Sequence, residues 1–314
     1  MKILNILLLM FGLATIGASQ TVESPKPETA IPGTRVSLVP PAGFTPAAQF
    51  SGFWQESLGS SIMVTEFPGP LSEVSSGFLN PSDLAKRGMA LLNKLEVKVN
   101  NETGLLLNLK QNAFGTEYRK WLLIFGDEKE SVMLAATFPK ELEGDLSEKM
   151  KASILTVKWD RERKVAPTEG LNFTFTEKGE IKLAKRIANS LLYTKSGIFP
   201  SKAVDDPLFI IGQTLSKLDI DDKEQFAKSR LSQTATITEI EIERLSQVTV
   251  DNLSGYEILA KGNDTESGNS MVVYQVVLYE DRSYYIMQGL VSAKHGQTYL
   301  PVFKEMARSF RRKK

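Results

Sequence analysis

The sequence contains no cysteine and only one histidine, His295. A chain without cysteine forms no disulfide, thiolate nucleophile, cysteine-ligated zinc site or iron–sulfur cluster, and it carries no lipid-modified cysteine. One imidazole cannot supply the usual ligand set of a catalytic zinc site, and no Gly-x-Ser-x-Gly elbow accompanies it to form a serine triad. We therefore expect no metal and no catalytic residue, and we interpret His295 as a surface or capping residue.

The sequence also has little net charge. Its 38 Lys and Arg residues stand against 37 Asp and Glu residues, which gives a formal net charge of +1. A nearly neutral chain has no overall attraction to nucleic acid. The glycine patterns of Walker loops and dinucleotide-binding folds are absent as well. These absences argue against nucleotide-dependent enzymes, and we expect neither a cofactor nor a nucleic-acid partner.

The one long apolar run lies near the start of the sequence, from Ile3 to Ile16. It follows the positive charge of Lys2 and precedes small residues, which is the three-part order of a secretory signal peptide. A run of about 14 residues is shorter than the roughly 20 that span a bilayer. We predict a cleavable signal peptide at residues 1–19 and a flexible leader at residues 20–33, so the protein would be secreted or periplasmic. A retained membrane anchor is the alternative.

The length of 314 residues and the hydrophobic content of 42% predict about two globular domains. In the first half, Asn80 as N-cap and Pro81 at the first helical position predict a helix. Its expected buried stripe is Leu84, Gly88, Leu91, Leu92 and Leu95. A second helix is expected from Asp145, with Leu146, Met150 and Ile154 on its buried face. The strands predicted in this half are Val36–Val39, Ile62–Phe67, Leu105–Leu109, Glu117–Phe125 and Ser131–Phe138.

The second half repeats this order of elements. Its predicted strands are Leu171–Thr176, Ile187–Tyr193, Leu208–Gln213, Thr236–Glu243, Gly255–Ala260, Met271–Tyr279 and Ser283–Val291, and its predicted helices are Asp221–Gln233 and Thr298–Phe310. Gly104 matches Gly255 and Met150 matches Met306, at separations of 151 and 156 residues (255 − 104 and 306 − 150). We interpret this as an internal duplication, with a chance alignment of two α+β domains as the alternative. The expected domains are residues 34–160 and 171–314, joined by a linker at residues 161–170.

The predicted fold class is α+β, with two tandem domains that each pack helices on an antiparallel β-sheet. This plan, together with the leading segment Leu38–Phe44 (Leu-Val-Pro-Pro-Ala-Gly-Phe), resembles the PsbP-like α/β/α sandwich family. That family includes the extrinsic PsbP proteins of photosystem II, the envelope protein DcrB and the Mog-type Ran-binding protein. In the second half the nearest counterpart of the leading segment is Ser196–Pro200. The resemblance implies two copies of the sandwich and a non-catalytic binding or assembly role.

Carboxylates are the remaining candidates for catalysis. Glycoside hydrolases place two acids about 5 to 10 Å apart in a cleft. Glu239, Glu241 and Glu243 alternate with isoleucines, so one strand would place all three acids on the same face. A solvated face or a charged edge strand explains the same pattern without a substrate. The aspartates between Asp219 and Asp222 lack the glycine and glutamate of an EF-hand loop, and we interpret them as residues of a helix start.

Four aromatic residues are candidates for binding a partner. Phe53 and Trp54 follow an early loop, and Tyr274 and Tyr284 lie on a predicted hairpin. Exposed aromatic side chains are frequent interface anchors, and burial in the core is the alternative. Because strand alternation sends Tyr284 and Tyr285 to opposite faces, we expect one of them in the core and the other exposed or paired across the strand.

A basic segment that includes Arg311 and Arg312 ends the sequence. Cations at this place complement the negative end of the last predicted helix. The alternative is a weak contact of this tail with an anionic membrane surface or an acidic partner.

Together these patterns predict an exported, non-catalytic binding or assembly protein of the cell envelope. We expect it to present its sheet surfaces and an inter-domain groove to a partner, either an envelope protein or a small ligand. The alternatives are a carboxylate-dependent hydrolase acting on envelope polysaccharide through Glu239, Glu241 and Glu243, and a carrier of a small apolar ligand. The carrier would need a cavity between sheet and helix.

Overall fold

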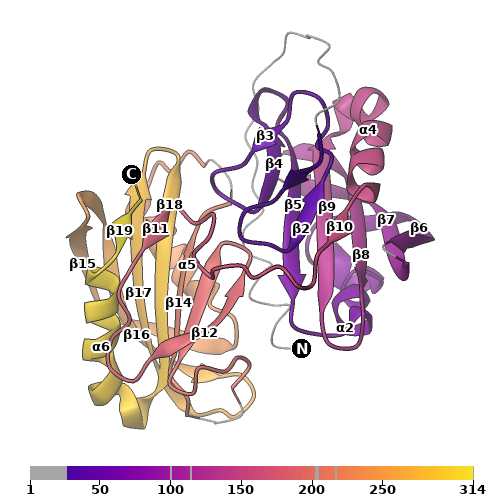
Figure 1. The fold of residues 1–314 in the computed structure, drawn as a ribbon. Helices are drawn as coiled ribbons and strands as arrows, with labels where there is room; N and C mark the ends of the chain where they lie inside the picture. Colours follow the sequence, from indigo (N-terminus) through magenta and orange to yellow (C-terminus); the bar gives the residue numbers. More distant parts are fainter. Residues whose placement is uncertain (1–26, 100, 114, 202–204, 216–217, 314) are drawn as a thin grey trace. The chain divides into compact units, whose positions relative to one another are not determined.

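A computed structural model describes residues 27–99, 101–113, 115–201, 205–215 and 218–313. The predicted signal peptide and the first part of the predicted leader lie outside the described residues. The chain divides after Gly170 into two compact units, and each unit contains one seven-stranded antiparallel sheet (Figure 1). The fold class is therefore α+β, as predicted.

The first unit ends at Gly170. Its strands are β1 (Thr29–Ala30), β2 (Val36–Leu38), β3 (Thr45–Pro46), β4 (Gly52–Gln55), β5 (Ser60–Phe67), β6 (Met89–Val99), β7 (Glu102–Ala113), β8 (Thr116–Gly126), β9 (Ser131–Pro139) and β10 (Lys158–Trp159). Its helices are η2 (Glu56–Leu58), α2 (Leu71–Ser76), α3 (Pro81–Ala85), η3 (Lys140–Leu142) and α4 (Glu143–Leu155). The large sheet has the order β3-β4-β5-β9-β8-β7-β6, and a small sheet has the order β1-β2-β10.

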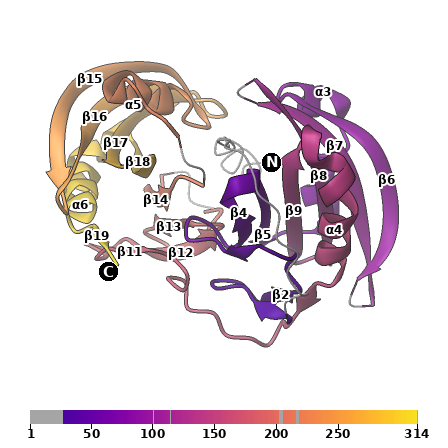
Figure 2. The same cartoon turned by 90° about the horizontal axis from the view of Figure 1, so that it is seen from above.

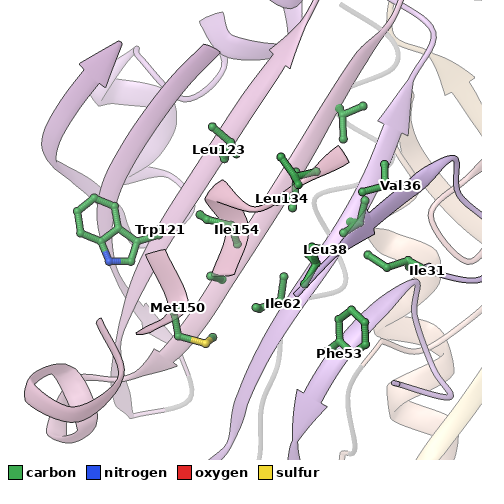
Figure 3. Close-up of a cluster of buried hydrophobic side chains, with 14 of the residues drawn as sticks. Ile31, Val36, Leu38, Phe53, Ile62, Trp121, Leu123, Leu134, Met150 and Ile154 are labelled. Carbon is green, nitrogen blue, oxygen red and sulfur yellow. The ribbon is translucent and has the colours of Figure 1, made fainter. Parts of the chain in front are cut away.

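Helix α4 covers one face of the large sheet over β8 and β9. Its predicted buried residues Met150 and Ile154 are confirmed, and they belong to one core cluster with Trp121, Leu123 and Leu134 of the sheet (Figure 3). Apolar residues at helical spacing thus meet apolar residues at strand spacing, which is what joins the helix to the sheet. The helix begins two residues earlier than predicted, because η3 leads directly into it.

The predicted long helix after Asn80 is wrong beyond its first turn. Asn80 does cap α3, and its side chain accepts hydrogen bonds from the backbone N–H groups of the first turn, but the helix is only five residues long. At Gly88 the backbone takes a φ of +67°, where an added Cβ would lie 2.8 Å from the carbonyl oxygen of Asn112. From there the chain continues as strand β6. Leu92 and Leu95, predicted to be buried, are 47% and 42% exposed.

The second unit begins at Leu171. Its strands are β11 (Phe173–Thr174), β12 (Lys182–Ile187), β13 (Ser190–Thr194), β14 (Leu208–Gln213), β15 (Ile237–Val250), β16 (Leu253–Asp264), β17 (Ser270–Glu280), β18 (Ser283–Ser292) and β19 (Arg311–Arg312), and its helices are α5 (Lys223–Ser232), η4 (Ala293–His295) and α6 (Gly296–Arg308). The large sheet has the order β12-β13-β14-β18-β17-β16-β15, and β11 pairs with β19. The predicted strand Ile187–Tyr193 is instead two strands, because Ala188 adopts a positive φ in a tight turn between β12 and β13.

Both faces of this second sheet are covered. Tyr285 belongs to the cluster that contains residues of α6, whereas Tyr284 belongs to the cluster that contains residues of α5. The alternation predicted for these two tyrosines is therefore confirmed, and so is the prediction for each of them: Tyr285 lies in the core, and Tyr284 is paired across the strands with Tyr279. A helix on each face buries both side chains.

The two large sheets have the same strand order, and the elements match position by position. Phe125 pairs with Val132 as Leu278 pairs with Tyr285, and α6 begins 153 residues after α4 (296 − 143), the same separation as that of the two pairs (278 − 125 and 285 − 132). At this separation Met150 corresponds to Phe303, so the sequence match of Met150 with Met306 is three residues out of register. Figure 2 shows β6 and β15 as long, curved strands at corresponding edges of their sheets.

Candidate functional site

Three of the four candidate aromatic residues lie in the protein core. Phe53, Tyr274 and Tyr284 are only 2%, 1% and 2% exposed. The hydroxyl group of Tyr274 donates to Oε1 of Glu257 at 2.8 Å, and burial raises its pKa, so the hydroxyl group stays a neutral donor. Side chains this deeply buried offer no surface to a partner in this fold. Trp54, on β4, is half-buried.

The basic C-terminal segment is part of the fold rather than a free tail. Arg312 lies on β19 and forms ion pairs with Asp251, at 2.9 Å, and with Glu280. Hydrogen bonds to these two carboxylates raise the pKa of Arg312. Arg311 is exposed, but its guanidinium group donates to the backbone carbonyl of Arg308 at 3.0 Å. Because the charge of Arg312 is satisfied within the second unit, this residue does not support the alternative of a membrane contact.

The three acids expected on one face of a strand lie on β15, at the edge of the second sheet. Their predicted alternation is wrong, because β15 has irregularities between Thr238 and Glu241 and again after Ile242, and Glu239 has a φ of +51°. Glu239 accepts a hydrogen bond from Asn263, Glu243 pairs with Lys261, and Glu241 is exposed. Irregularities of this kind re-aim side chains. Among the described residues no group of three or more His, Cys, Asp or Glu side chains is placed to hold a metal ion.

The other polar candidates have structural roles. Asp222 caps α5 and accepts a hydrogen bond from the backbone of Gln225 at 2.9 Å, as its position before a helix predicted. Asp219 forms a two-pronged ion pair with Arg282, at 2.8 and 2.9 Å. His295 stands at the start of α6 but makes no side-chain cap there.

The strongest candidate surface is the outer edge of the first sheet, strand β6. Five large hydrophobic side chains are more than a third exposed among the described residues, and two of them, Leu92 and Leu95, lie on β6. Leu95 is paired with Leu106, which belongs to the core cluster of α4, so it extends that apolar face to the sheet edge. Val97, half-buried, packs on the same cluster. We define the β6 edge as residues 92–98.

The charged residues of the β6 edge occupy the other face. Lys94, Glu96 and Lys98 alternate with the apolar residues and are exposed. The β6–β7 hairpin closes with Val99 paired to Glu102, and Asn101, just before Glu102, has a φ of +67°. In such a hairpin the closing pair is hydrogen-bonded and the pairs alternate from there. The backbone N–H and C=O groups of Lys94, Glu96 and Lys98 therefore point away from β7, toward the free edge.

This edge was missed at the sequence level because Leu84, Leu91, Leu92 and Leu95 fit a helical stripe. The signal that identifies it is the alternation of charged and apolar residues from Lys94 to Val99, which has the period of a strand. That alternation covers only six residues and follows a correctly predicted helix start at Pro81, so the helical spacing of the leucines outweighed it.

Comparison with known proteins gives no family. No family model and no curated protein matches the chain. The apo structure of the immunity protein TplEi of the T6SS from Pseudomonas aeruginosa is 12% identical and covers 90% of this chain and 97% of its own, with a TM-score of 0.33. LpqN, involved in cell envelope biogenesis of Mycobacterium tuberculosis, is 10% identical and covers 45% of this chain and 83% of its own, with a TM-score of 0.34.

The predicted resemblance to PsbP-like proteins also has a structural counterpart. Cyanobacterial PsbP from Synechocystis sp. PCC 6803 is 10% identical and covers 45% of this chain and 82% of its own, with a TM-score of 0.28. At these identities and scores the likeness is one of general architecture, and it assigns neither a family nor a function. In the described part of the chain no helix is long and apolar enough to cross a membrane.

Proposed function

We propose that this chain is a non-catalytic protein-binding module whose β6 edge receives an extended segment of a partner as an additional antiparallel strand. One observation carries the proposal. β6 is the terminal strand of its sheet among the described residues, and it exposes two leucines beside backbone groups that face no further strand; of these, the N–H group of Lys94 donates to Oδ1 of Asn93 at 2.8 Å. Strand addition uses both features, because backbone hydrogen bonds supply affinity and side chains at alternate positions supply specificity.

The way proteins usually protect sheet edges supports this interpretation. Natural edges are blocked by bulges, charged side chains such as lysine, proline or short strands, because an open edge pairs with other chains. β6 carries Lys94 and Lys98, but Glu96 lies between them, so its charges alternate in sign. β6 is 11 residues long, contains no proline, and has one irregularity, between Leu91 and Asn93. Toward the hairpin from that point the strand is regular, so it retains a straight stretch on which a second strand can form hydrogen bonds.

The cellular place of this binding is part of the proposal. The apolar run of residues 3–16, preceded by a lysine and followed by small residues, has the order of an export signal. We propose that the partner is met outside the cytoplasm. Fractionation of cells that express the full chain tests this step, because a protein that stays in the cytoplasm at full length contradicts it.

Proline substitution tests strand addition directly. Glu96→Pro removes a backbone N–H group that points to the free edge, whereas Val97→Pro removes one that bonds to β7. We expect a photoreactive amino acid at position 95 to crosslink a partner, and the crosslink to be lost in Glu96→Pro while the first unit stays folded. The same probe at position 242, on β15, is the control.

Two results contradict the proposal. One is a crosslink at position 95 that persists in Glu96→Pro, because strand addition requires that N–H group. The other is equal crosslinking from positions 95 and 242, because non-specific contact would then explain both. Val97→Pro is the control for loss of folding. It removes a β6–β7 hydrogen bond, so it must lower the melting temperature of the first unit.

A further inference from the structure

We infer that the segment received by the β6 edge is the β6 edge of a second copy of this chain, so that two first-unit sheets join into one continuous sheet. This inference rests on the proposed function, since it names the partner of the same edge. It comes from the order of charges on that edge, Lys94, Glu96 and Lys98, and from the direction of their backbone groups.

Backbone direction restricts how two β6 strands can pair. In an antiparallel ladder, residues whose N–H and C=O groups point outward must face each other across the new interface. These are the even-numbered residues from Lys94 to Lys98, by the hairpin closure at Val99 and Glu102. Two identical strands related by a two-fold axis therefore pair even residues with even residues, and only a few registers remain.

Charge then selects among those registers. If Leu95 lies on the two-fold axis, Lys94 of each copy faces Glu96 of the other, and two opposite-charge pairs form. If the axis lies at Glu96, the two Glu96 carboxylates face each other and Lys94 faces Lys98. Opposite charges across a ladder stabilise it, and like charges destabilise it. The axis at Leu95 is therefore favoured over the axis at Glu96. An axis at Val97 would also form two opposite-charge pairs, between Glu96 and Lys98, but it overlaps only residues 95–99 of β6, whereas the axis at Leu95 overlaps residues 92–98 of both copies.

The apolar residues fit the same register. With Leu95 on the axis, the two Leu95 side chains form a pair without backbone hydrogen bonds, the kind of pair in which side chains lie closest. Leu95 is 42% exposed in the single chain, and this contact would cover it from the same side as the core cluster of α4. One register thus buries the exposed leucine, pairs opposite charges and pairs the outward backbone groups.

The equivalent edge of the second sheet lacks this self-complementarity. Glu239, Glu241 and Glu243 give β15 three charges of one sign, and its irregularities fall among them. Two β15 edges would bring acids together in a distorted ladder. The inference therefore assigns self-association to the first unit alone.

Charge reversal tests the register in solution. Sedimentation velocity of the full chain over a range of concentrations is expected to show a monomer–dimer equilibrium. Lys94→Glu or Glu96→Lys alone turns two attractive pairs into repulsive ones, and we expect each to weaken the dimer about tenfold. The double variant Lys94→Glu with Glu96→Lys restores both pairs and should recover dimerisation. Glu241→Lys on β15 is the matched control and should change nothing.

A single introduced cysteine tests the geometry, because the native chain contains none. In the inferred register the two copies of position 95 lie across the axis within disulfide reach, so mild oxidation of Leu95→Cys should join two thiols into one intermolecular disulfide. Ile242→Cys should remain monomeric under the same conditions. A failure of Leu95→Cys to form dimers, or a double charge variant weaker than both single variants, overturns the inference.

The two proposals fail in distinguishable ways. A chain that is monomeric at every concentration, and whose position-95 crosslink contains a different protein that is lost in Glu96→Pro, overturns the second copy and leaves strand addition in place. A chain without a crosslink and without self-association overturns both. A crosslinked dimer of this chain that is lost in Glu96→Pro supports both.

Discussion

Strands β6 and β15 occupy the same position in two sheets of identical strand order, yet they present different edges. β6 exposes Leu92 and Leu95 beside Lys94 and Glu96, whereas β15 exposes a run of acids interrupted by two irregularities. The fold accommodates either edge, because both strands lie at the end of their sheets. The difference therefore shows which features the fold requires and which are free to serve binding.

The same contrast extends to the interior. At the separation of 153 residues that relates α4 to α6 (296 − 143), Lys120 of β8 corresponds to Val273 of β17, and Ala136 of β9 corresponds to Gly289 of β18. The two units therefore fill matching core positions with different residues. Substitutions at these positions show whether each unit unfolds independently of the other.

All three tryptophans, Trp54, Trp121 and Trp159, lie in the first unit. Tryptophan fluorescence therefore reports the unfolding of that unit, while circular dichroism reports both. The two signals together allow the unfolding of each unit to be followed in the intact chain.

The largest effect is expected at Lys120. Its side chain is 5% exposed, and burial lowers its pKa to about 8 from the usual 10.5. Protonation of this amine in the folded state is therefore costly, by about 3 kcal/mol at pH 7. Lys120→Met removes the cost and should raise the stability of the first unit by up to that amount, measured by tryptophan fluorescence during urea unfolding at pH 7.

The pH dependence of the stability difference between Lys120→Met and the native protein tests this explanation. Between pH 8 and 10.5 the unfolded chain holds a proton on Lys120 that the folded chain has released, so the stability of the native protein rises with pH in this window. The advantage of Lys120→Met should shrink over this range and vanish above it. An advantage that is constant from pH 7 to 10.5 contradicts the explanation. Val273→Met, at the matching position of the second sheet, should show no such dependence.

A second, smaller effect is expected at Gly289. A Cβ at this position would lie 2.3 Å from the ring of Phe303. The first unit places the larger Ala136 at the matching position, in one core cluster with Met150, which corresponds to Phe303 and is flexible enough to yield. Gly289→Ala should destabilise the second unit by about 2 kcal/mol through overpacking, seen by circular dichroism with the tryptophan transition unchanged. Adding Phe303→Met should recover most of the loss, and no recovery would contradict the matched packing.

The third effect concerns one arginine in each unit. Arg161, just after β10, forms ion pairs with Glu102 at 2.8 Å and Asp127 at 2.7 Å, and its guanidinium carbon lies 4.0 Å from the centroid of the Trp159 ring. Arg312, on β19, pairs with Asp251 and Glu280. Both arginines tie the end of the unit to hairpin ends of the large sheet.

Because these arginines are about a third exposed, their ion pairs are partly screened by solvent. Arg161→Met and Arg312→Met should each destabilise their own unit by about 1 kcal/mol, and the loss should fall at 1 M salt. Tryptophan fluorescence should detect the first substitution and not the second. Equal effects of both substitutions on the tryptophan transition would show that the two units unfold together.

The sequence predicts the interior of both units better than their edges. The strand Leu208–Gln213 and the buried face of α4 can be predicted from apolar spacing, because burial in the core requires apolar residues at the period of the strand or helix. At β6 a helical and a strand pattern overlap, and only the pairing with β7, a contact between separate segments, decides between them. The bulges of β15 and the pairing of Arg312 likewise depend on partners that local spacing does not reveal.

The smallest effect on stability, and the sharpest test of the edge comparison, is expected at Leu95 and Ile242. Both are exposed, so Leu95→Lys and Ile242→Lys should each change stability by no more than about 0.5 kcal/mol. Their effects on association should differ, since lysine at position 95 places two cations on the inferred axis, whereas position 242 lies on an edge that does not pair. Sedimentation velocity should show loss of the dimer for the first substitution and no change for the second. If both substitutions abolish association, the dimer uses the two edges alike, and the difference between β6 and β15 has no consequence for binding.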